Sequence, residues 1–196
     1  MPELQAARGA PLITSEGSGH PTTVSAPPGR SATLLAFAVA ATALLVDVVT
    51  KHLAVRELTG HAPVQVVGDL LELRLVRNPG AAFSAGASFT PVITVFALVA
   101  AVVVFYYALR VRNRGWAVAL GLLLAGVSGN LLDRLFRAPG PFRGHVVDFF
   151  ALPHWPVFNV ADICIDAAGV LFVVLLIRGI RLDGTRHAHD PRRDDS

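Results

Sequence analysis

Long apolar runs separated by short polar segments dominate this chain. Four of them, at residues 32–55, 91–109, 116–132 and 160–180, contain few or no charged residues. Each run is close to the ~20 residues that a helix needs to cross roughly 30 Å of hydrocarbon. Four such runs leave too little polar sequence to cover them with a water-soluble shell. The pattern therefore predicts an all-α membrane protein with four transmembrane helices.

The polar segment between the first two runs has its own pattern. Residues 71–75 alternate between apolar and polar side chains, which is typical of a half-buried strand. Residues 63–67 can pair with this strand across a turn at Gly68 and Asp69. The sequence Asn78-Pro79-Gly80 then ends the strand. We therefore expect a small sheet that lies on one end of the helix bundle.

Composition supports the membrane interpretation. The chain is 53% hydrophobic and only 16% charged, with a mean hydropathy of +0.55, whereas an ordinary soluble domain carries about 25% charged residues. These values argue against a soluble enzyme, a disordered protein and a fibrous protein. The single cysteine, Cys164, excludes an intramolecular disulfide framework and a cysteine-rich zinc module.

The distribution of arginine predicts the orientation in the membrane. Arg110, Arg112 and Arg114 lie in the short loop between the second and third runs, and further arginines follow the fourth run. Since short cytoplasmic loops are enriched in Lys and Arg, we expect both termini inside and the loops at 56–90 and 133–159 outside. The expected organisation is a disordered cytoplasmic tail at 1–30, a membrane domain at 31–181 and a charged cytoplasmic tail at 182–196.

Charged residues inside the apolar runs need a partner or a role, because each costs roughly 2.5–3.5 kcal/mol at mid-membrane. Asp47 and Lys51 are four residues apart and predict an ion pair on one helix face. A direct catalytic role for either is the alternative. Asp133 and Arg134 are adjacent, so each is expected to pair elsewhere and to hold the outer loops.

Two further acids suggest chemistry. Asp148 follows two valines, which predicts a raised pKa, and Asp162 lies where the chain enters the fourth run from outside. If the two converge, one carboxylate can deprotonate a water while the other, still protonated, donates to a scissile carbonyl. The alternative is a pair of packing acids satisfied by Asn or Arg. Asp166, one turn beyond Asp162, remains a second possible partner for it.

Five segments together resemble the lipoprotein signal peptidases (signal peptidase II) of bacteria. The matching segments are DVVTK at 47–51, RNPGAAFS at 77–84, GNLLDR at 129–134, GHVVDF at 144–149 and FNVAD at 158–162. A single segment is a weak signal, whereas all of them, in this order and at suitable membrane positions, are highly specific.

The resemblance implies a four-helix membrane aspartic endopeptidase with a small extracytoplasmic β-cradle. Such enzymes remove the signal peptide from diacylglyceryl-modified prolipoproteins just before the lipidated cysteine, and the cyclic peptide globomycin blocks them. The implied catalytic pair is Asp148 and Asp162. The implied substrate-binding or supporting residues are Asp47, Lys51, Asn78, Gly80, Ala81, Phe83, Gly129, Asn130, Asp133, Arg134, Asn159 and Ala161.

The resemblance also sets expectations about location and partners. We expect a monomer in the bacterial cytoplasmic membrane with its active site at the outer face. Its partners are then lipid-modified prolipoprotein signal peptides and membrane lipids, without nucleic acid, metal or cofactor.

Several implied positions have a physical reason. The small residues Gly80 and Ala81 let an extended substrate backbone approach closely. Asn78 and Asn159 can donate to a carbonyl or a carboxylate without adding charge. Phe83 either covers the site or packs into lipid or core. The chain departs from the family pattern in a longer stretch at 137–142 and in Asp166.

Other chemistries fit less well. Gly126-Val127-Ser128-Gly129 suggests a rhomboid-type serine protease, but that mechanism needs a histidine base within reach of the serine, and the run at 116–132 that holds Ser128 contains no histidine. Cys164 has no base nearby in the sequence, and the His-Glu-x-x-His motif of metalloproteases is missing from the sequence. A transporter that uses the acids as a proton relay is the non-enzymatic alternative. It would place them at mid-bilayer, where they would face one another.

Overall fold

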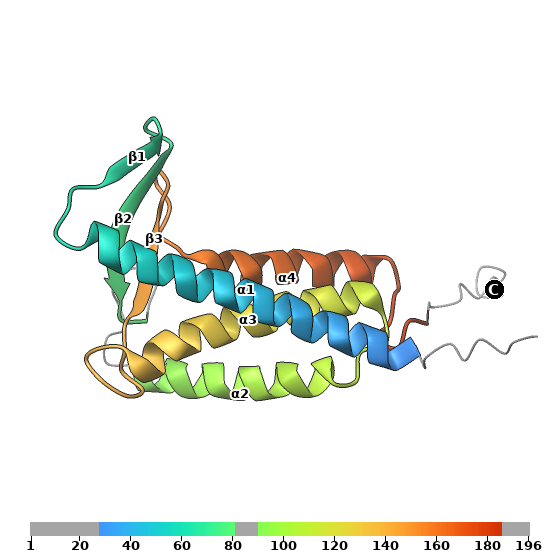
Figure 1. The fold of residues 1–196 in the computed structure, drawn as a ribbon. Helices are drawn as coiled ribbons and strands as arrows, with labels where there is room; N and C mark the ends of the chain where they lie inside the picture. Colours follow the sequence, from blue (N-terminus) through green and yellow to red (C-terminus); the bar gives the residue numbers. More distant parts are fainter. Residues whose placement is uncertain (1–27, 81–89, 186–196) are drawn as a thin grey trace, which may run out of the picture.

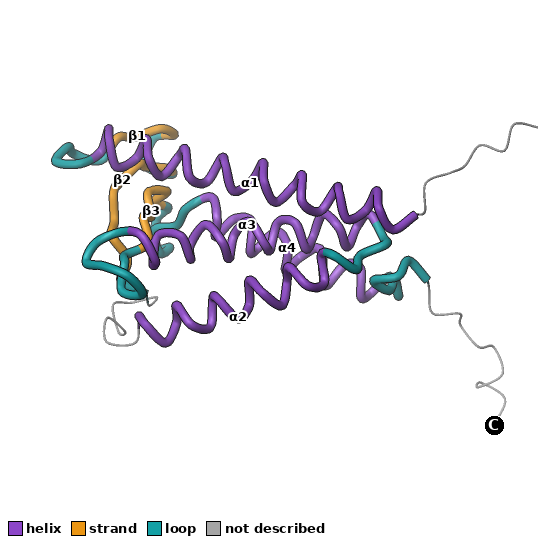
Figure 2. The backbone as a smooth tube through the Cα atoms, turned by 60° about the horizontal axis from the view of Figure 1, so that its bottom comes forward, coloured by secondary structure: helices purple, strands orange, loops and turns teal. Residues whose placement is uncertain are grey.

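A computed structural model describes residues 28–80 and 90–185. In these residues the chain forms four helices, α1 (Pro28–Leu58), α2 (Thr90–Ala108), α3 (Arg114–Phe136) and α4 (Val160–Ile177). It also forms one sheet from β1 (Val64–Val67), β2 (Leu71–Asn78) and β3 (Val146–Ala151). The helices lie side by side and the sheet lies at one end of them (Figure 1, Figure 2).

All four helices are long and apolar enough to cross a membrane. The outward faces of α1, α2 and α4 expose large apolar side chains such as Leu34, Phe96, Val102 and Ile177. Such faces suit contact with lipid chains. The prediction of an all-α membrane protein with four spans and a small sheet is therefore confirmed.

The helix at the centre of the bundle is α3, which packs against α1, α2 and α4. Small residues allow this close packing, as is usual between membrane helices. At Gly126, for example, an added Cβ would lie 2.6 Å from Cγ1 of Ile165 on α4. Alanines dominate the buried cluster that joins α1, α2 and α3 in the half of the bundle away from the sheet.

The sheet is antiparallel with the strand order β1-β2-β3. The hairpin of β1 and β2 and the end of β2 at Asn78 agree with the sequence analysis. Strand β3 was not predicted from the sequence, because its residues are almost all buried and lack alternation. Val147 and Phe149 of β3 pack against Ala54 and Leu58, and this contact attaches the sheet to the end of α1.

Helix boundaries differ slightly from the apolar runs. Helix α1 begins at Pro28, so the last three residues of the expected tail at 1–30 belong to this helix, while residues 1–27 lie outside the described residues. Helix α3 extends to Phe136, which brings Asp133 and Arg134 into its last turn. Asn113 caps the start of α3 and accepts bonds from the backbone N–H groups of Gly115 and Trp116.

Candidate functional site

Asp148 and Asp162 come together where the sheet meets the helix bundle. Asp148 lies on β3, where it pairs with Val76 of β2, and its side chain is 2% exposed. Asp162 lies in the first turn of α4 and is half-buried. The chain leaves β3 at Ala151 and returns to the same region at Asn159, the N-cap of α4.

Side-chain amides hold both carboxyl groups. Asp148 accepts a bond of 3.0 Å from Nδ2 of Asn78 and one of 2.6 Å from Nδ2 of Asn159. Asp162 accepts a bond of 2.7 Å from Nδ2 of Asn130 and one of 3.1 Å from the backbone N–H of Asn159. Nδ2 of Asn159 also donates to Oδ1 of Asn130 at 3.2 Å. Two linked amides therefore connect the two acids.

Burial dominates the electrostatics of Asp148. Loss of solvent raises the pKa of this carboxyl from its ordinary value of 3.8 to about 6, although the bonds from Asn78 and Asn159 oppose the rise. The nearby charge of Asp162 adds to the rise. The raised pKa that the apolar neighbours of Asp148 predicted is thus confirmed.

A buried ion network lies behind the two acids. Nζ of Lys51 is 2.9 Å from Oδ2 of Asp47 and 3.0 Å from Oδ2 of Asp133, so the predicted ion pair of Asp47 and Lys51 is confirmed. Lys51 also donates to Oδ1 of Asn130 at 3.0 Å. Asp133 forms a second ion pair with Arg137, which the sequence analysis missed although an i, i+4 spacing points to it.

The network also holds the backbone on either side of the site. Asp47 accepts a bond of 2.9 Å from the N–H of Ala161, the residue before Asp162. Asp133 accepts a bond of 3.1 Å from the N–H of Val147, the residue before Asp148. Each of the two supporting acids therefore positions the residue next to one of the paired acids.

Arg134 supplies a cation beside the pair. Its Nη1 donates to the backbone carbonyl of Asn130 at 3.1 Å, and its charge interacts with both Asp148 and Asp162. Its Nε is buried and has no hydrogen-bond partner in the described part of the chain. This group is a candidate donor to a bound molecule.

The segment that follows β2 completes the described part of the site. Oδ1 of Asn78 accepts a bond of 3.0 Å from the N–H of Gly80, which leaves Nδ2 to face Asp148. Gly80 has a φ of +127°, a conformation that L side chains rarely adopt. Pro79 accepts a bond from the hydroxyl of Thr90 at the start of α2. Two expected site residues, Ala81 and Phe83, lie outside the described residues.

The side chains of Asp166, Cys164 and Ser128 form no hydrogen bond or ion pair with these groups within the described part of the chain. Asp166 is exposed, and no bond connects it to Asp162 within residues 28–80 and 90–185. Cys164 is buried and Ser128 is half-buried. The longer stretch at 137–142 is held in place, since Phe142 accepts a bond of 3.1 Å from Thr94 and Gly144 donates one of 3.0 Å to Arg134.

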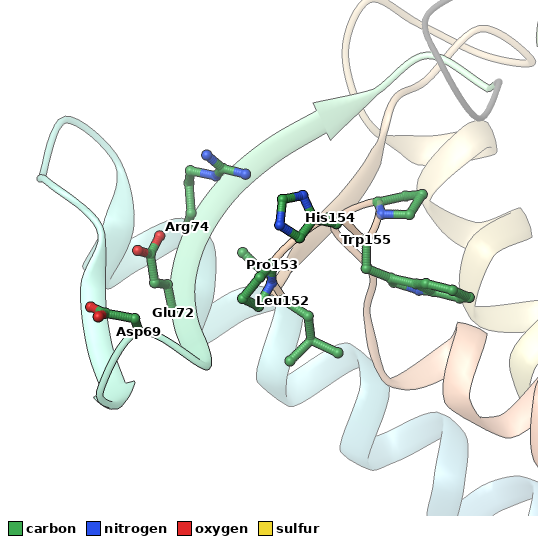
Figure 3. A pocket seen from close by; sticks show the side chains of 9 residues that line it. Asp69, Glu72, Arg74, Leu152, Pro153, His154 and Trp155 are labelled. Carbon is green, nitrogen blue, oxygen red and sulfur yellow. The ribbon is translucent and has the colours of Figure 1, made fainter.

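An open groove of about 620 Å³ lies on the sheet, away from the paired acids. Asp69, Glu72 and Arg74 line one side of it and the loop at 152–156 the other (Figure 3). None of the expected site residues lines this groove.

Four helices that can span a membrane define a multi-pass membrane protein, and the two amide-linked carboxyl groups at one end of them are the arrangement that an aspartic peptidase requires. The family model described as "Signal peptidase (SPase) II" matches residues 39–178. The chain belongs to this signal peptidase II family, and it is a protease.

Relatives and solved structures agree with this assignment. The chain is 45% identical to the lipoprotein signal peptidase of Mycobacterium tuberculosis over 193 residues, which cover 96% of this chain and 94% of the relative. It is 47% identical to that of Mycobacterium avium over 93% of this chain and 100% of the relative. It is also similar to a solved structure described as a bacterial membrane enzyme determined by the in meso method at 2.3 Å resolution. That match has a TM-score of 0.58 and 27% identity, and covers 82% of this chain and 95% of that one.

Proposed function

We propose that this protease cleaves the signal peptide from a diacylglyceryl-modified prolipoprotein, just before the lipidated cysteine, and that Asp148 and Asp162 activate the attacking water. The observation that carries the proposal is the amide-linked pair of carboxyl groups at the sheet end of the bundle. The family, whose members from Mycobacterium are lipoprotein signal peptidases, supports the choice of substrate.

The two acids suit different roles. Asp162 is half-buried and accepts two hydrogen bonds, so it is the carboxylate that a water can reach. Asp148 is almost fully buried and has a pKa of about 6, which favours it as the acid that retains a proton. Asp162 takes a proton from water while the water oxygen bonds to the scissile carbonyl carbon. The proton of Asp148 binds the carbonyl oxygen.

The second half of the reaction restores both groups. The carbon–nitrogen bond breaks as the tetrahedral intermediate collapses, and the proton held by Asp162 passes to the leaving amine of the cysteine. The proton on the intermediate's oxygen returns to Asp148 as the new carboxyl group forms. Arg134, whose Nε has no hydrogen-bond partner among the described residues, and the half-buried backbone at Gly80 are suited to hold the extended substrate.

The distribution of positive charge supports an active site at the outer face of the membrane. The loop with Arg110, Arg112 and Arg114 and the end of α4 with Arg178 and Arg181 lie at the end of the bundle opposite the sheet (Figure 1). Since cytoplasmic loops collect positive charge, this end is the cytoplasmic one and both termini are inside.

Cleavage of a lipidated prolipoprotein by the purified protein in detergent tests the proposal. We expect Asp148→Asn and Asp162→Asn each to abolish cleavage, because neither amide can take up or supply the required proton. Asp166→Asn, Ser128→Ala and Cys164→Ala serve as controls and should retain activity. An unlipidated precursor should not be cleaved, and globomycin should inhibit.

The outcomes separate the alternatives. If Asp166→Asn is inactive and Asp148→Asn is active, then Asp166 is the partner of Asp162. Loss of activity in Ser128→Ala or Cys164→Ala alone would indicate nucleophilic catalysis instead. A folded wild-type protein that leaves the lipidated substrate intact would refute the proposed substrate.

A further inference from the structure

Lys51 occupies the centre of the buried network. Its Nζ forms ion pairs with Asp47 at 2.9 Å and with Asp133 at 3.0 Å, and it donates a hydrogen bond to Oδ1 of Asn130 at 3.0 Å. A lysine ammonium donates hydrogen bonds and accepts none. The carboxamide of Asn130 must therefore turn its oxygen toward Lys51.

This constraint determines what Asn130 offers to Asp162. With Oδ1 facing Lys51, Nδ2 faces the carboxylate of Asp162 and donates to it at 2.7 Å. If the carboxamide of Asn130 were flipped, its oxygen would face the carboxylate of Asp162, and the two oxygens would repel each other. Asn159 also donates to Oδ1 of Asn130, but at 3.2 Å and from a neutral group. A hydrogen bond from a charged donor such as Lys51 is roughly twice as strong as one between two neutral groups.

We propose that Lys51 is a positioning residue for catalysis, which acts through the carboxamide of Asn130 to set the hydrogen bond and the orientation of Asp162. The proposal rests on the proposed function, since it takes Asp162 to be the carboxylate that activates water. In this proposal Lys51 does not contact the substrate. Its effect on the reaction passes through one intervening side chain.

A purely structural role for Lys51 is the competing explanation. Its single positive charge pairs with both Asp47 and Asp133, and a buried acid without a partner is strongly destabilising. The other ionisable groups around the site are Arg134 of α3, Arg137 at the C-cap of α3, Asp148 of β3 and Asp162 of α4. The two explanations can be separated by removing one cation and one anion together.

The experiment measures kcat, KM and the apparent melting temperature of the full-length protein in detergent, with a lipidated prolipoprotein as substrate. Lys51→Met should lower both kcat and the melting temperature. The charge-balanced variant Lys51→Met/Asp47→Asn should regain most of the melting temperature while its kcat stays on the order of tenfold or more below wild type, with little change in KM. Arg137→Gln removes a cation from the same Asp133 without touching Asn130, so it should lose stability and keep kcat.

A second variant tests the last step of the relay directly. Asn130→Asp keeps an acceptor for Lys51 but removes the donor to Asp162, so kcat should again fall by on the order of tenfold. The triple variant Lys51→Met/Asp47→Asn/Asn130→Asp should have the same kcat as Asn130→Asp alone. Both sets of changes interrupt the same path from Lys51 through Asn130 to Asp162.

Each outcome decides the matter. A wild-type kcat in the charge-balanced variant, or in a folded Asn130→Asp variant, would overturn the positioning role and leave Lys51 as a counter-ion. If the charge-balanced variant does not regain its melting temperature, the test depends on the kcat of Asn130→Asp alone. Asp162→Asn is measured in the same series. Wild-type activity in that variant would refute the proposed function itself, whereas its inactivity alongside a normal kcat in Asn130→Asp would refute only the relay.

Discussion

Gly129 on α3 lies directly against the buried carboxylate of Asp47. A Cβ added at this position would collide with Oδ2 of Asp47 and would lie 3.1 Å from its Cγ and 3.2 Å from Cβ of Ala161. Asp47 cannot move away freely, because it is bound to Lys51 and to the N–H of Ala161. We therefore expect Gly129→Ala to disrupt the network that supports the paired acids.

The expected change in the free energy of unfolding is the sum of one stabilising and two destabilising contributions. Replacing glycine by alanine within a helix stabilises by roughly 0.5–1 kcal/mol. Overpacking costs about 1–3 kcal/mol, and a weakened hydrogen bond to a buried carboxylate costs about 1.5–3 kcal/mol. The net destabilisation is then about 2–5 kcal/mol. At about 2–4 °C per kcal/mol for a chain of this size, the apparent melting temperature should fall by on the order of 10 °C.

Gly169→Ala on α4 is the matched control. Gly169 is exposed and an added Cβ would have no atom within 4 Å, so only the gain in helix propensity applies. Thermal unfolding of both variants in the same detergent should show a fall for Gly129→Ala and no fall for Gly169→Ala. If Gly129→Ala melts at or above the wild-type temperature, the proposed tight contact with Asp47 is wrong.

Three further expectations concern stability and substrate binding. Since burial raises the pKa of Asp148 from 3.8 to about 6, its contribution to stability is fully present below about pH 4 and is lost as the pH rises through 6. The difference in melting temperature between wild type and Asp148→Asn should therefore shift against wild type as the pH rises from 4 to 7.5. A difference that stays constant over this pH range would contradict the expectation. Asn113→Ala removes the cap of α3 and should cost about 1 kcal/mol, whereas Asn113→Ser should retain most of the stability; equal melting temperatures for the two would contradict the capping role. Arg134→Lys keeps the charge but loses Nε, so kcat/KM for the lipidated substrate should fall by on the order of tenfold, and an unchanged value would exclude a donor role for Nε.

Much of the fold could be predicted from the sequence, because membrane insertion places a strong local constraint on it. Each span must be apolar over about 20 residues, so the four helices could be recognised from hydropathy alone. Period-two alternation at 71–75 likewise indicated β2. Strand β3 lacks such a pattern, because both of its faces are buried, one against α1 and one at the site.

The sequence by itself determined the membrane class, the number of spans and the set of polar residues that need partners, since a charge in an apolar run is visible without any structure. Apart from Asp47 and Lys51, whose spacing of four residues predicted their ion pair, tertiary structure decided which of these residues meet. Asn130 and Asn159 are 29 positions apart, and Lys51 and Asn130 are 79 apart, yet each pair shares a hydrogen bond. Asp148 rather than Asp166 joins Asp162 through these amides because the chain that leaves β3 returns to the start of α4, whereas Asp166 is exposed one turn further along α4. Such pairings depend on how the helices and the sheet pack in three dimensions, and no local pattern in the chain records that packing.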